Sequence, residues 1–232
     1  MTNQNISKNF FLKLPLRIVI IVLLGFFVAM GIYLNKGENL PATISPIPVS
    51  NEEDDKIIDD EKTTVSTGNN IKGNPDASIT IIEFSDFECP FCKKFHIILN
   101  QILDEYPHEV NWVYRHLPSN FHPEARLAAE ASECAAEQGK FWEFAEKLFE
   151  NQVELGKSLY QESAADLKLN MEQFNSCLSS RKYEDKVEAD YQDAIKMEIQ
   201  EIPASLVNGE LVLGAVPYET LKTIVEQALS SL

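Results

Sequence analysis

Residues 78–95 read SITIIEFSDFECPFCKKF, and this stretch decides the fold. Its first part is a short run rich in β-branched residues that follows an Asn-Pro-Asp turn, which predicts a buried strand. Proline is favoured at the first position of a helix, so Pro90 predicts a helix that continues to about Tyr106. Cys89 then occupies the N-cap of this helix, and Cys92 is its third residue.

The Cys-Pro-Phe-Cys motif at residues 89–92, between a strand and a helix, is typical of a redox-active pair of thiols. Unpaired backbone N–H groups and the positive end of the helix dipole favour a thiolate at the N-cap. Such settings lower the pKa of a cysteine from about 8.5 into the range of about 3.5–7.5. We therefore expect an exposed Cys89 thiolate that attacks or leaves a substrate disulfide, with Cys92 resolving the mixed disulfide.

Two other roles for the motif have to be weighed. A structural zinc site needs four ligands, usually in two spaced pairs, whereas Cys134 and Cys177 are isolated and only His96 follows the motif closely. A purely structural disulfide between Cys89 and Cys92 closes too short a loop to stabilise much. We therefore expect a redox site with no metal and no cofactor.

The flanking sequence predicts an α/β domain. A second strand covers residues 110–117 and ends at Pro118, and a helix with His122-Pro123 in its first turn ends at Gly139. Asn208-Gly209 predicts a hairpin. A helix between the first two strands makes them parallel, and the hairpin adds antiparallel strands, which gives a mixed sheet. Further helices are expected at residues 140–151, 159–167, 171–179, 183–196 and 218–229, and the hairpin strands at 204–207 and 210–213.

The N-terminal residues 1–36 predict a membrane anchor. Residues 18–34 form an uncharged run that is long enough, as a helix, to approach the thickness of a bilayer. Three cationic side chains precede this run and only Lys36 follows it closely, so the positive-inside rule leaves the N-terminus in the cytoplasm and exports the rest of the chain. A cleaved signal peptide is the alternative, because Ala29-Met30-Gly31 resembles a cleavage site.

The segment that follows, residues 37–72, predicts a disordered tether. It contains three prolines and an acidic run at residues 52–62, with few apolar side chains to bury. Residues 73–232 then form the folded domain. The net charge of the chain is −16 although residues 1–36 are basic, so the exported part is strongly acidic, which excludes nucleic acid as a partner.

The chain resembles the DsbA-like thiol–disulfide oxidoreductases, which have a thioredoxin fold with an inserted helical domain. The resemblance covers roughly residues 72–230. It rests on GNPDASITIIEFSDFECPFCKKF at Gly73–Phe95, on AAEQGKFW at Ala135–Trp142, and on a proline followed by the hairpin. It implies an all-helical insertion at about residues 119–196.

The resemblance also implies roles for particular residues. Pro203 would be a cis proline packed against Cys89, and with Pro90, Phe91 and Ile202 it would shape the groove for substrate peptide. Glu83 would be a buried carboxyl that accepts the proton of Cys92 during exchange. The apolar neighbours of Glu83 independently favour burial over an edge-facing position.

The chain departs from the family pattern in two places. The dipeptide between the cysteines lacks the histidine of strong oxidases, so Phe91 gives the Cys89 thiolate neither a hydrogen bond nor a charge, and we expect a less oxidising disulfide. The loop before Pro203 reads Gln200-Glu201-Ile202 where Gly-Thr or Gly-Val is frequent in the family. A carboxylate at Glu201 near the site would oppose thiolate formation.

Cys134 and Cys177 form a second pair. Cys134 shares a helical stripe with Leu127 and Ala131, and Cys177 shares one with Phe174 and Leu178, so both thiols should point into the core of the helical insertion. Outside the cytoplasm such cysteines pair, and closing this loop stabilises by about 4 kcal/mol in the chain-entropy model. Two inert buried thiols are the alternative.

The remaining candidates are structural. The aromatic and apolar residues of the block 141–149 are expected in the core. The four histidines are expected at the surface or at helix caps: His96, His108, His116 and His122.

These inferences predict a monomeric thiol–disulfide oxidase at the bacterial cytoplasmic membrane, with its catalytic domain outside. Its substrates would be reduced or misoxidised exported polypeptides, and a quinone-linked membrane thiol oxidase would reoxidise it. A disulfide isomerase or reductase of the same fold is the close alternative, although residues 37–72 are too polar for the dimerisation domain that isomerases usually add. A non-catalytic module that binds metal or peptide is the third.

Overall fold

The computed structural model describes residues 70–232, so the predicted membrane helix at residues 18–34 and nearly all of the predicted tether lie outside the described residues. Within residues 70–232, no helix is both long and apolar enough to cross a bilayer.

A five-stranded mixed sheet lies at the centre of the described part of the chain, with the strand order β1-β3-β2-β4-β5. β2 pairs in parallel with β3 and antiparallel with β4, so β2 is central and carries the motif at its C-terminal end. The strands are β1 (Ile71–Gly73), β2 (Ile79–Ser85), β3 (Val110–His116), β4 (Ala204–Val207) and β5 (Glu210–Leu213). The predicted mixed α/β fold is therefore confirmed.

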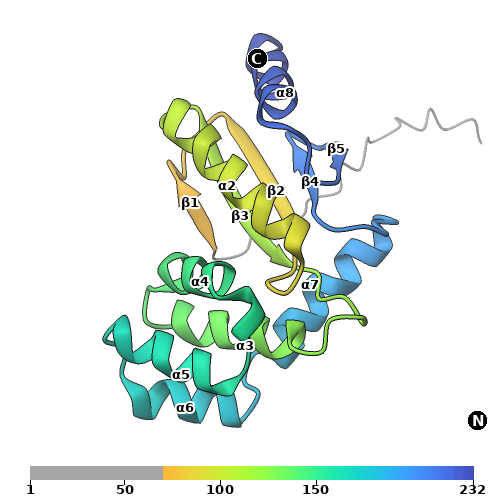
Figure 1. The fold of residues 1–232 in the computed structure, drawn as a ribbon. Helices are drawn as coiled ribbons and strands as arrows, with labels where there is room; N and C mark the ends of the chain where they lie inside the picture. Colours follow the sequence, from red (N-terminus) through yellow and green to blue (C-terminus); the bar gives the residue numbers. More distant parts are fainter. Residues whose placement is uncertain (1–69) are drawn as a thin grey trace, which may run out of the picture. The chain divides into compact units, whose positions relative to one another are not determined.

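The helices of the described residues occur at three places along the chain (Figure 1). α2 (Pro90–Glu105) joins β2 to β3, and α8 (Tyr218–Ser230) closes the chain. Between β3 and β4 the chain forms five further helices and one 3₁₀ turn: α3 (Ala125–Ala136), α4 (Phe141–Glu150), η1 (Gln152–Glu154), α5 (Lys157–Asp166), α6 (Met171–Ser179) and α7 (Glu184–Lys196).

Alternation along the strands gives the sheet two different faces. Ile79, Ile81, Trp112 and Tyr114 face a core that continues through α2, α8 and helices α3 to α6. Phe84 and Ala204 belong to a second, smaller cluster that α7 covers. The helical insertion therefore extends the core of the sheet instead of forming a separate one.

Several boundaries differ from the sequence prediction by one to three residues, and two of these differences have a tertiary cause. Residues 70–72, assigned to the tether, belong to the folded unit: β1 pairs with β3, and the carbonyl of Asn70 accepts the N–H of Tyr114 at 3.0 Å. β1 was missed because a three-residue strand has no periodicity of its own.

The helix expected to begin at His122-Pro123 begins instead at Ala125, with Glu124 at the N-cap. His122 and the N–H of Glu124 are bonded to the turn that precedes Cys89, through Asp86 and Glu88. These long-range contacts hold residues 122–124 outside the helix.

Candidate redox-active site

Cys89 and Cys92 lie at the start of α2, directly after the C-terminal end of β2. Cys89 is the N-cap, with φ −79° and ψ 121°, and Pro90 opens the helix. The N–H of Cys89 donates to the carbonyl of Asp86 at 3.1 Å, and the Cys89 carbonyl accepts the N–H of Lys93 at 3.1 Å. Both cysteines are free thiols.

The two thiols are less accessible than expected. Cys89 was predicted to be exposed, but only 4% of its surface is accessible, and Cys92 is fully buried. Phe91, between them, is 58% exposed. The prediction was wrong because the loop before Pro203 covers Cys89: its Sγ lies 4.0 Å from the carbonyl oxygen of Ile202. A substrate sulfur therefore has a restricted approach to Cys89.

The two thiols differ in their pKa. A hydrogen bond from the Cys92 thiol lowers the pKa of Cys89 to about 6, with help from the N–H groups of Cys92 and Phe91, while burial opposes the shift. Burial raises the pKa of Cys92 well above its usual range, and the neighbouring Cys89 sulfur adds to this effect. At neutral pH, Cys89 is therefore a thiolate and Cys92 a thiol. The helix amides contribute as expected, but the second cysteine contributes more.

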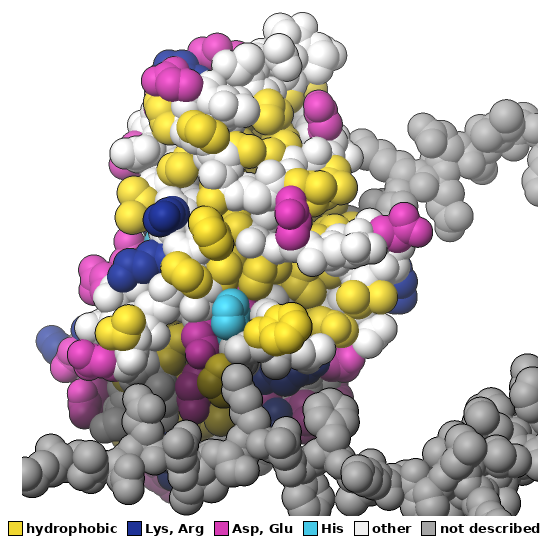
Figure 2. All heavy atoms as spheres, turned by 45° about the vertical axis from the view of Figure 1, so that its right-hand side comes forward, with side chains coloured by type: hydrophobic (Ala, Val, Ile, Leu, Met, Phe, Trp, Pro, Cys, Tyr) yellow, Lys and Arg dark blue, Asp and Glu magenta, His cyan; other side chains and the backbone are white. Residues whose placement is uncertain are grey.

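Pro203 follows a cis peptide bond with Ile202. β4 begins at the next residue, and Ala204 pairs with Phe84 of β2, so the sheet holds the proline loop beside the motif. A cavity of about 320 Å³ extends from this loop. Its lining comes from the segment after β3, from α7 and from the proline loop: Leu117–Phe121, Tyr191, Ile195 and Ile199–Ile202. Figure 2 shows exposed hydrophobic side chains gathered on one face of the molecule.

Glu83 is completely buried in β2, between Tyr114 of β3 and Ser205 of β4 in the pairing register. Burial raises the pKa of its carboxyl to about 8, and the Ser85 hydroxyl and Trp112 indole moderate this rise. Neither carboxyl oxygen has a hydrogen-bond partner of standard geometry. The negative charge of Glu83 in turn raises the pKa of Cys92. This carboxyl can therefore take up or release a proton near neutral pH, close to the buried thiol.

Asp86 is a site residue that the sequence analysis missed. Its side chain is fully buried and accepts three hydrogen bonds, from the N–H of Glu88 at 2.7 Å, the N–H of Ser119 at 2.8 Å and Nδ1 of His122 at 2.7 Å. Its charge raises the pKa of Cys89, the effect expected of Glu201. The bond from Asp86 to an N–H two residues later is a local Asx turn, which could have been recognised in the sequence.

The helical insertion also holds the turn before Cys89. Glu88 Oε2 accepts the N–H of Glu124 at 2.7 Å. Nε2 of Gln152 donates to the carbonyls of Phe87 at 2.7 Å and Cys89 at 2.9 Å. Residues far along the chain therefore position the reactive turn.

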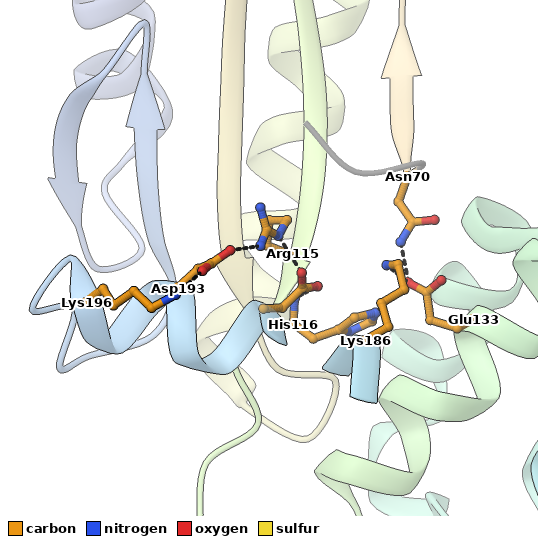
Figure 3. A network of polar contacts seen from close by, with 8 residues as sticks. Asn70, Arg115, His116, Glu133, Lys186, Asp193 and Lys196 are labelled. Atoms are coloured by element: carbon orange, nitrogen blue, oxygen red, sulfur yellow. Dashed lines mark hydrogen bonds and ion pairs between the residues drawn. The ribbon is translucent and has the colours of Figure 1, made fainter. Parts of the chain in front are cut away.

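Two of the four histidines are buried, which corrects the expectation that all lie at the surface or at caps. His96 packs against Trp112 and Phe149, and its Nε2 lies 3.2 Å from Glu146. His116 belongs to a buried polar network (Figure 3), in which its Nε2 contacts Glu133 at 2.8 Å.

Glu133 is the centre of that network. Its Oε1 also accepts hydrogen bonds from Asn70 and from Lys186, each at 2.6 Å. Burial opposes ionisation of Glu133, but the bonds and charges of His116 and Lys186 outweigh it and hold its pKa at about 2. Nearby, Arg115 of β3 binds Asp190 at 2.6 Å and Asp193 at 2.8 Å on α7. These contacts fasten the insertion to the sheet.

Cys134 of α3 and Cys177 of α6 are joined by a disulfide with an S–S distance of 2.04 Å, across 43 residues. Both are buried, whereas Leu127, which was expected on the same inward stripe, is 39% exposed. It lies at the rim of α3, where it lines a shallow cavity with α5 and α6. The aromatic block is in the core, with Phe141, Phe144 and Phe149 buried and Trp142 partly so. Within residues 70–232, no group of three or more His, Cys, Asp or Glu side chains is arranged to hold a metal ion.

Comparison with known proteins places this geometry in context. A family model described as thioredoxin matches residues 66–227. The chain is 35% identical over 162 residues to a protein named Na(+)/H(+) antiporter NhaA 3 from Salinispora tropica, which is 69% of this chain and 25% of that protein. A protein named Na(+)/H(+) antiporter NhaA from Herminiimonas arsenicoxydans is 29% identical over 228 residues, or 97% of this chain and 34% of its own length. The chain thus spans only about a quarter to a third of these relatives.

Solved structures match the fold over most of their own length. The oxidised form of BdbD from Bacillus subtilis is 29% identical with a TM-score of 0.63, covering 69% of this chain and 92% of BdbD. A thioredoxin-like oxidoreductase from Silicibacter pomeroyi is 26% identical with a TM-score of 0.63, covering 69% of this chain and 91% of that one. The thiol–disulfide exchange protein alpha-DsbA2 from Wolbachia pipientis shares the fold at a TM-score of 0.62, with 16% identity over 68% of this chain and 86% of its own.

Proposed function

Because the chain belongs to the thioredoxin family, among the DsbA-like thiol–disulfide oxidoreductases, we propose that it forms disulfide bonds in exported polypeptides through Cys89 and Cys92. The observation that carries this proposal is the difference in pKa between the two thiols. The pKa of Cys89 is lowered to about 6, whereas burial raises that of Cys92 well above its usual range. A low pKa makes Cys89 a good leaving group, which favours release of an oxidised substrate.

The exchange proceeds in two steps. A substrate thiolate attacks Sγ of Cys89 in the oxidised pair, which forms a mixed disulfide and breaks the Cys89–Cys92 bond. The departing Cys92 sulfur takes a proton, and Glu83 is the acid that supplies it, since its pKa of about 8 keeps it largely protonated at neutral pH.

In the second step, another substrate thiolate attacks the substrate sulfur of the mixed disulfide and expels the Cys89 thiolate. The substrate has then lost two electrons and two protons to become a disulfide. The enzyme holds both electrons as a Cys92 thiol and a Cys89 thiolate. Of the two substrate protons, one restores Glu83 by way of solvent and the other stays in solvent. In the reverse direction, Glu83 as carboxylate removes the Cys92 proton.

Substrate binding falls to the proline loop. The carbonyl of Ile202 lies against Cys89 Sγ, and the cis peptide bond to Pro203 turns the loop at that point. An extended client chain lying along this loop, between Phe91 and Ile202, brings its own sulfur to Cys89. The exposure of Phe91 supports this role, since it offers an apolar surface beside the restricted sulfur.

The rest of the proposal concerns location and partners. The uncharged run at residues 18–34 and its cationic flank support a single-pass anchor or a cleaved signal, with the domain outside the bacterial cytoplasmic membrane. A quinone-linked membrane thiol oxidase would reoxidise the pair. The disulfide between Cys134 and Cys177 agrees with an oxidising compartment. Cation exchange forms no part of the proposal, because the chain covers only 25% and 34% of the two antiporters described above.

A refolding assay tests the proposal. The full chain, oxidised beforehand and held in detergent, is mixed without glutathione with a reduced, unfolded client. We expect one client disulfide per enzyme molecule for the wild type and none for Cys89→Ser or Cys92→Ser, because neither variant can form the oxidised pair. Activity only toward scrambled disulfides would favour the isomerase. Stoichiometric copper or zinc in the purified protein would contradict a redox enzyme.

A further inference from the structure

The cysteine motif has no histidine of its own, but the fold brings one to it from elsewhere in the chain. His122 lies 33 positions after Cys89, in the segment that connects β3 to α3. Its Nδ1 donates to Asp86 Oδ2 at 2.7 Å, and the side chain is 25% exposed. The imidazole is therefore fixed at one nitrogen while part of the ring still reaches solvent.

Several contacts place His122 against the turn that ends at Cys89. The carbonyl of Asp86, its partner, accepts the Cys89 N–H at 3.1 Å. Two residues after His122, the N–H of Glu124 donates to Glu88, the neighbour of Cys89, at 2.7 Å. The residues just before His122 line the same cavity as Ile202, whose carbonyl touches the Cys89 sulfur.

The charges around His122 favour its protonated form. The carboxylate of Asp86 is buried and opposes a negative charge on Cys89. Partial burial disfavours a charged imidazole, but the bond and charge of Asp86, together with the charges of Cys89 and Glu88, outweigh burial and raise the pKa of His122. A protonated His122 therefore offsets the charge of Asp86 at the thiolate.

Resting on the function proposed above, we propose that His122, held by Asp86 beside the turn that ends at Cys89, is a positioning residue that offsets the acidic charge near the Cys89 thiolate and so sets the oxidising strength of the pair. The motif at residues 89–92 suggested a disulfide less oxidising than that of strong oxidases, because Phe91 carries no charge. In the folded chain the inserted segment replaces that missing charge.

The other charged groups around the site have separate partners or act against a thiolate. Lys93 donates to the carbonyl of Glu150 at 3.1 Å, and Lys94 lies over the Phe91 ring at 5.4 Å. His116 is engaged by Glu133. Three further groups are acidic: Glu88, Glu124, whose N–H donates to Glu88, and Glu201, which lines the cavity. The charge of Glu88 favours protonation of His122.

Coupling between two titrating groups is reciprocal, which gives a test that needs no client protein. The imidazole titrations of His122 and His108 are followed by NMR in the full chain, once with Cys89 and Cys92 oxidised and once with both reduced. We expect the midpoint of His122 to be higher in the reduced form, because the thiolate is then present. His108, which is exposed and follows the end of α2 opposite to the motif, serves as the internal control and should titrate alike in both forms.

Two variants separate charge from hydrogen bonding. His122→Asn can still donate to Asp86 but carries no charge, whereas His122→Ala loses both. In His122→Asn, the thiolate absorbance of Cys89 should titrate about one pH unit higher, and the equilibrium with glutathione should move up to about tenfold toward the oxidised enzyme. His122→Ala should give a similar redox change and also unfold at lower temperature.

The proposal is overturned by either of two results. One is a His122 midpoint that is the same in both redox forms. The other is a folded His122→Asn protein whose thiolate titration matches that of the wild type, since the hydrogen bond alone would then account for His122. If the protein failed the refolding assay but showed these titrations, the proposed oxidase function would be wrong. The charge coupling between His122 and Cys89 would still hold.

Discussion

Glu83 and Glu133 are both buried carboxyls beside the same sheet, yet their chemistry is opposite. Glu83 has no hydrogen-bond partner of standard geometry, and burial raises its pKa to about 8. Glu133 accepts bonds from His116, Lys186 and Asn70, and its pKa is held at about 2 in spite of burial. Burial is similar at the two positions, so the partners decide. One region keeps a proton that can be exchanged, and the other keeps a permanent charge that fastens the insertion.

The same substitution should therefore have opposite effects at the two positions. Glu133→Gln removes the charge that His116 and Lys186 share, and breaking such a buried pair costs about 3–5 kcal/mol of unfolding free energy. In the wild type, this contribution is present above the ordinary pKa of 4.5 and is lost as the pH falls toward about 2. Urea unfolding of the variant and of the wild type at several pH values measures both the loss of unfolding free energy and its dependence on pH. A loss below 1 kcal/mol would remove the distinction between the two carboxyls.

The disulfide between Cys134 and Cys177 begins at the residue after Glu133 and strengthens the same region. Removing it with a Cys134→Ala/Cys177→Ala double variant should lower the unfolding free energy by about 4 kcal/mol, because a closed loop of this length restricts the unfolded chain. Urea unfolding of this variant and of the wild type under oxidising conditions gives the difference. Equal stabilities would mean that the bond adds nothing to the network. The comparison can be repeated in a mild reductant that reduces only the Cys89–Cys92 disulfide. If the wild type is still more stable than the double variant, the two cysteine pairs are independent.

At Glu83 the substitution should change the unfolding free energy in the opposite direction. A carboxyl with a raised pKa costs stability as the pH rises from 4.5 to about 8, because the unfolded chain ionises first. Glu83→Gln should therefore match the wild type near pH 4 and be more stable by about 3 kcal/mol near pH 7. Proton transfer to and from Cys92 should slow in the same variant, which stopped-flow exchange with a small disulfide can measure. A variant destabilised at every pH would mean that Glu83 has a structural partner.

The smallest effect is expected at the end of the network. Asn70→Ala removes one of the three donors to Glu133 and leaves His116 and Lys186 in place, so the loss should be about 1 kcal/mol, the value of a single hydrogen bond. Chemical unfolding of the variant and of the wild type measures this difference. A loss as large as that of Glu133→Gln would show that Asn70 anchors β1 as well as the carboxylate.

The parts of the molecule that follow from short stretches of sequence were predictable. The strand, the N-cap at Cys89 and the helix from Pro90 lie within residues 78–95, and the hairpin turn at Asn208-Gly209 depends on two residues that adopt positive φ. The burial of Glu83 followed from its apolar neighbours. The cis bond before Pro203 came only from the family resemblance, because no local pattern distinguishes it.

The amino-acid sequence by itself determined the position of the reactive cysteines and the order of the elements, because both depend on residues within a few turns of one another. Only the tertiary structure decided the exposure of Cys89, the ends of α3 and of the tether, and the environment of each carboxyl and histidine. Asp86 meets His122, and Asn70 meets Glu133, across 36 and 63 positions of the chain. Charges and hydrogen bonds act through space at a few ångströms, so the pKa of a buried group depends on neighbours that folding brings together.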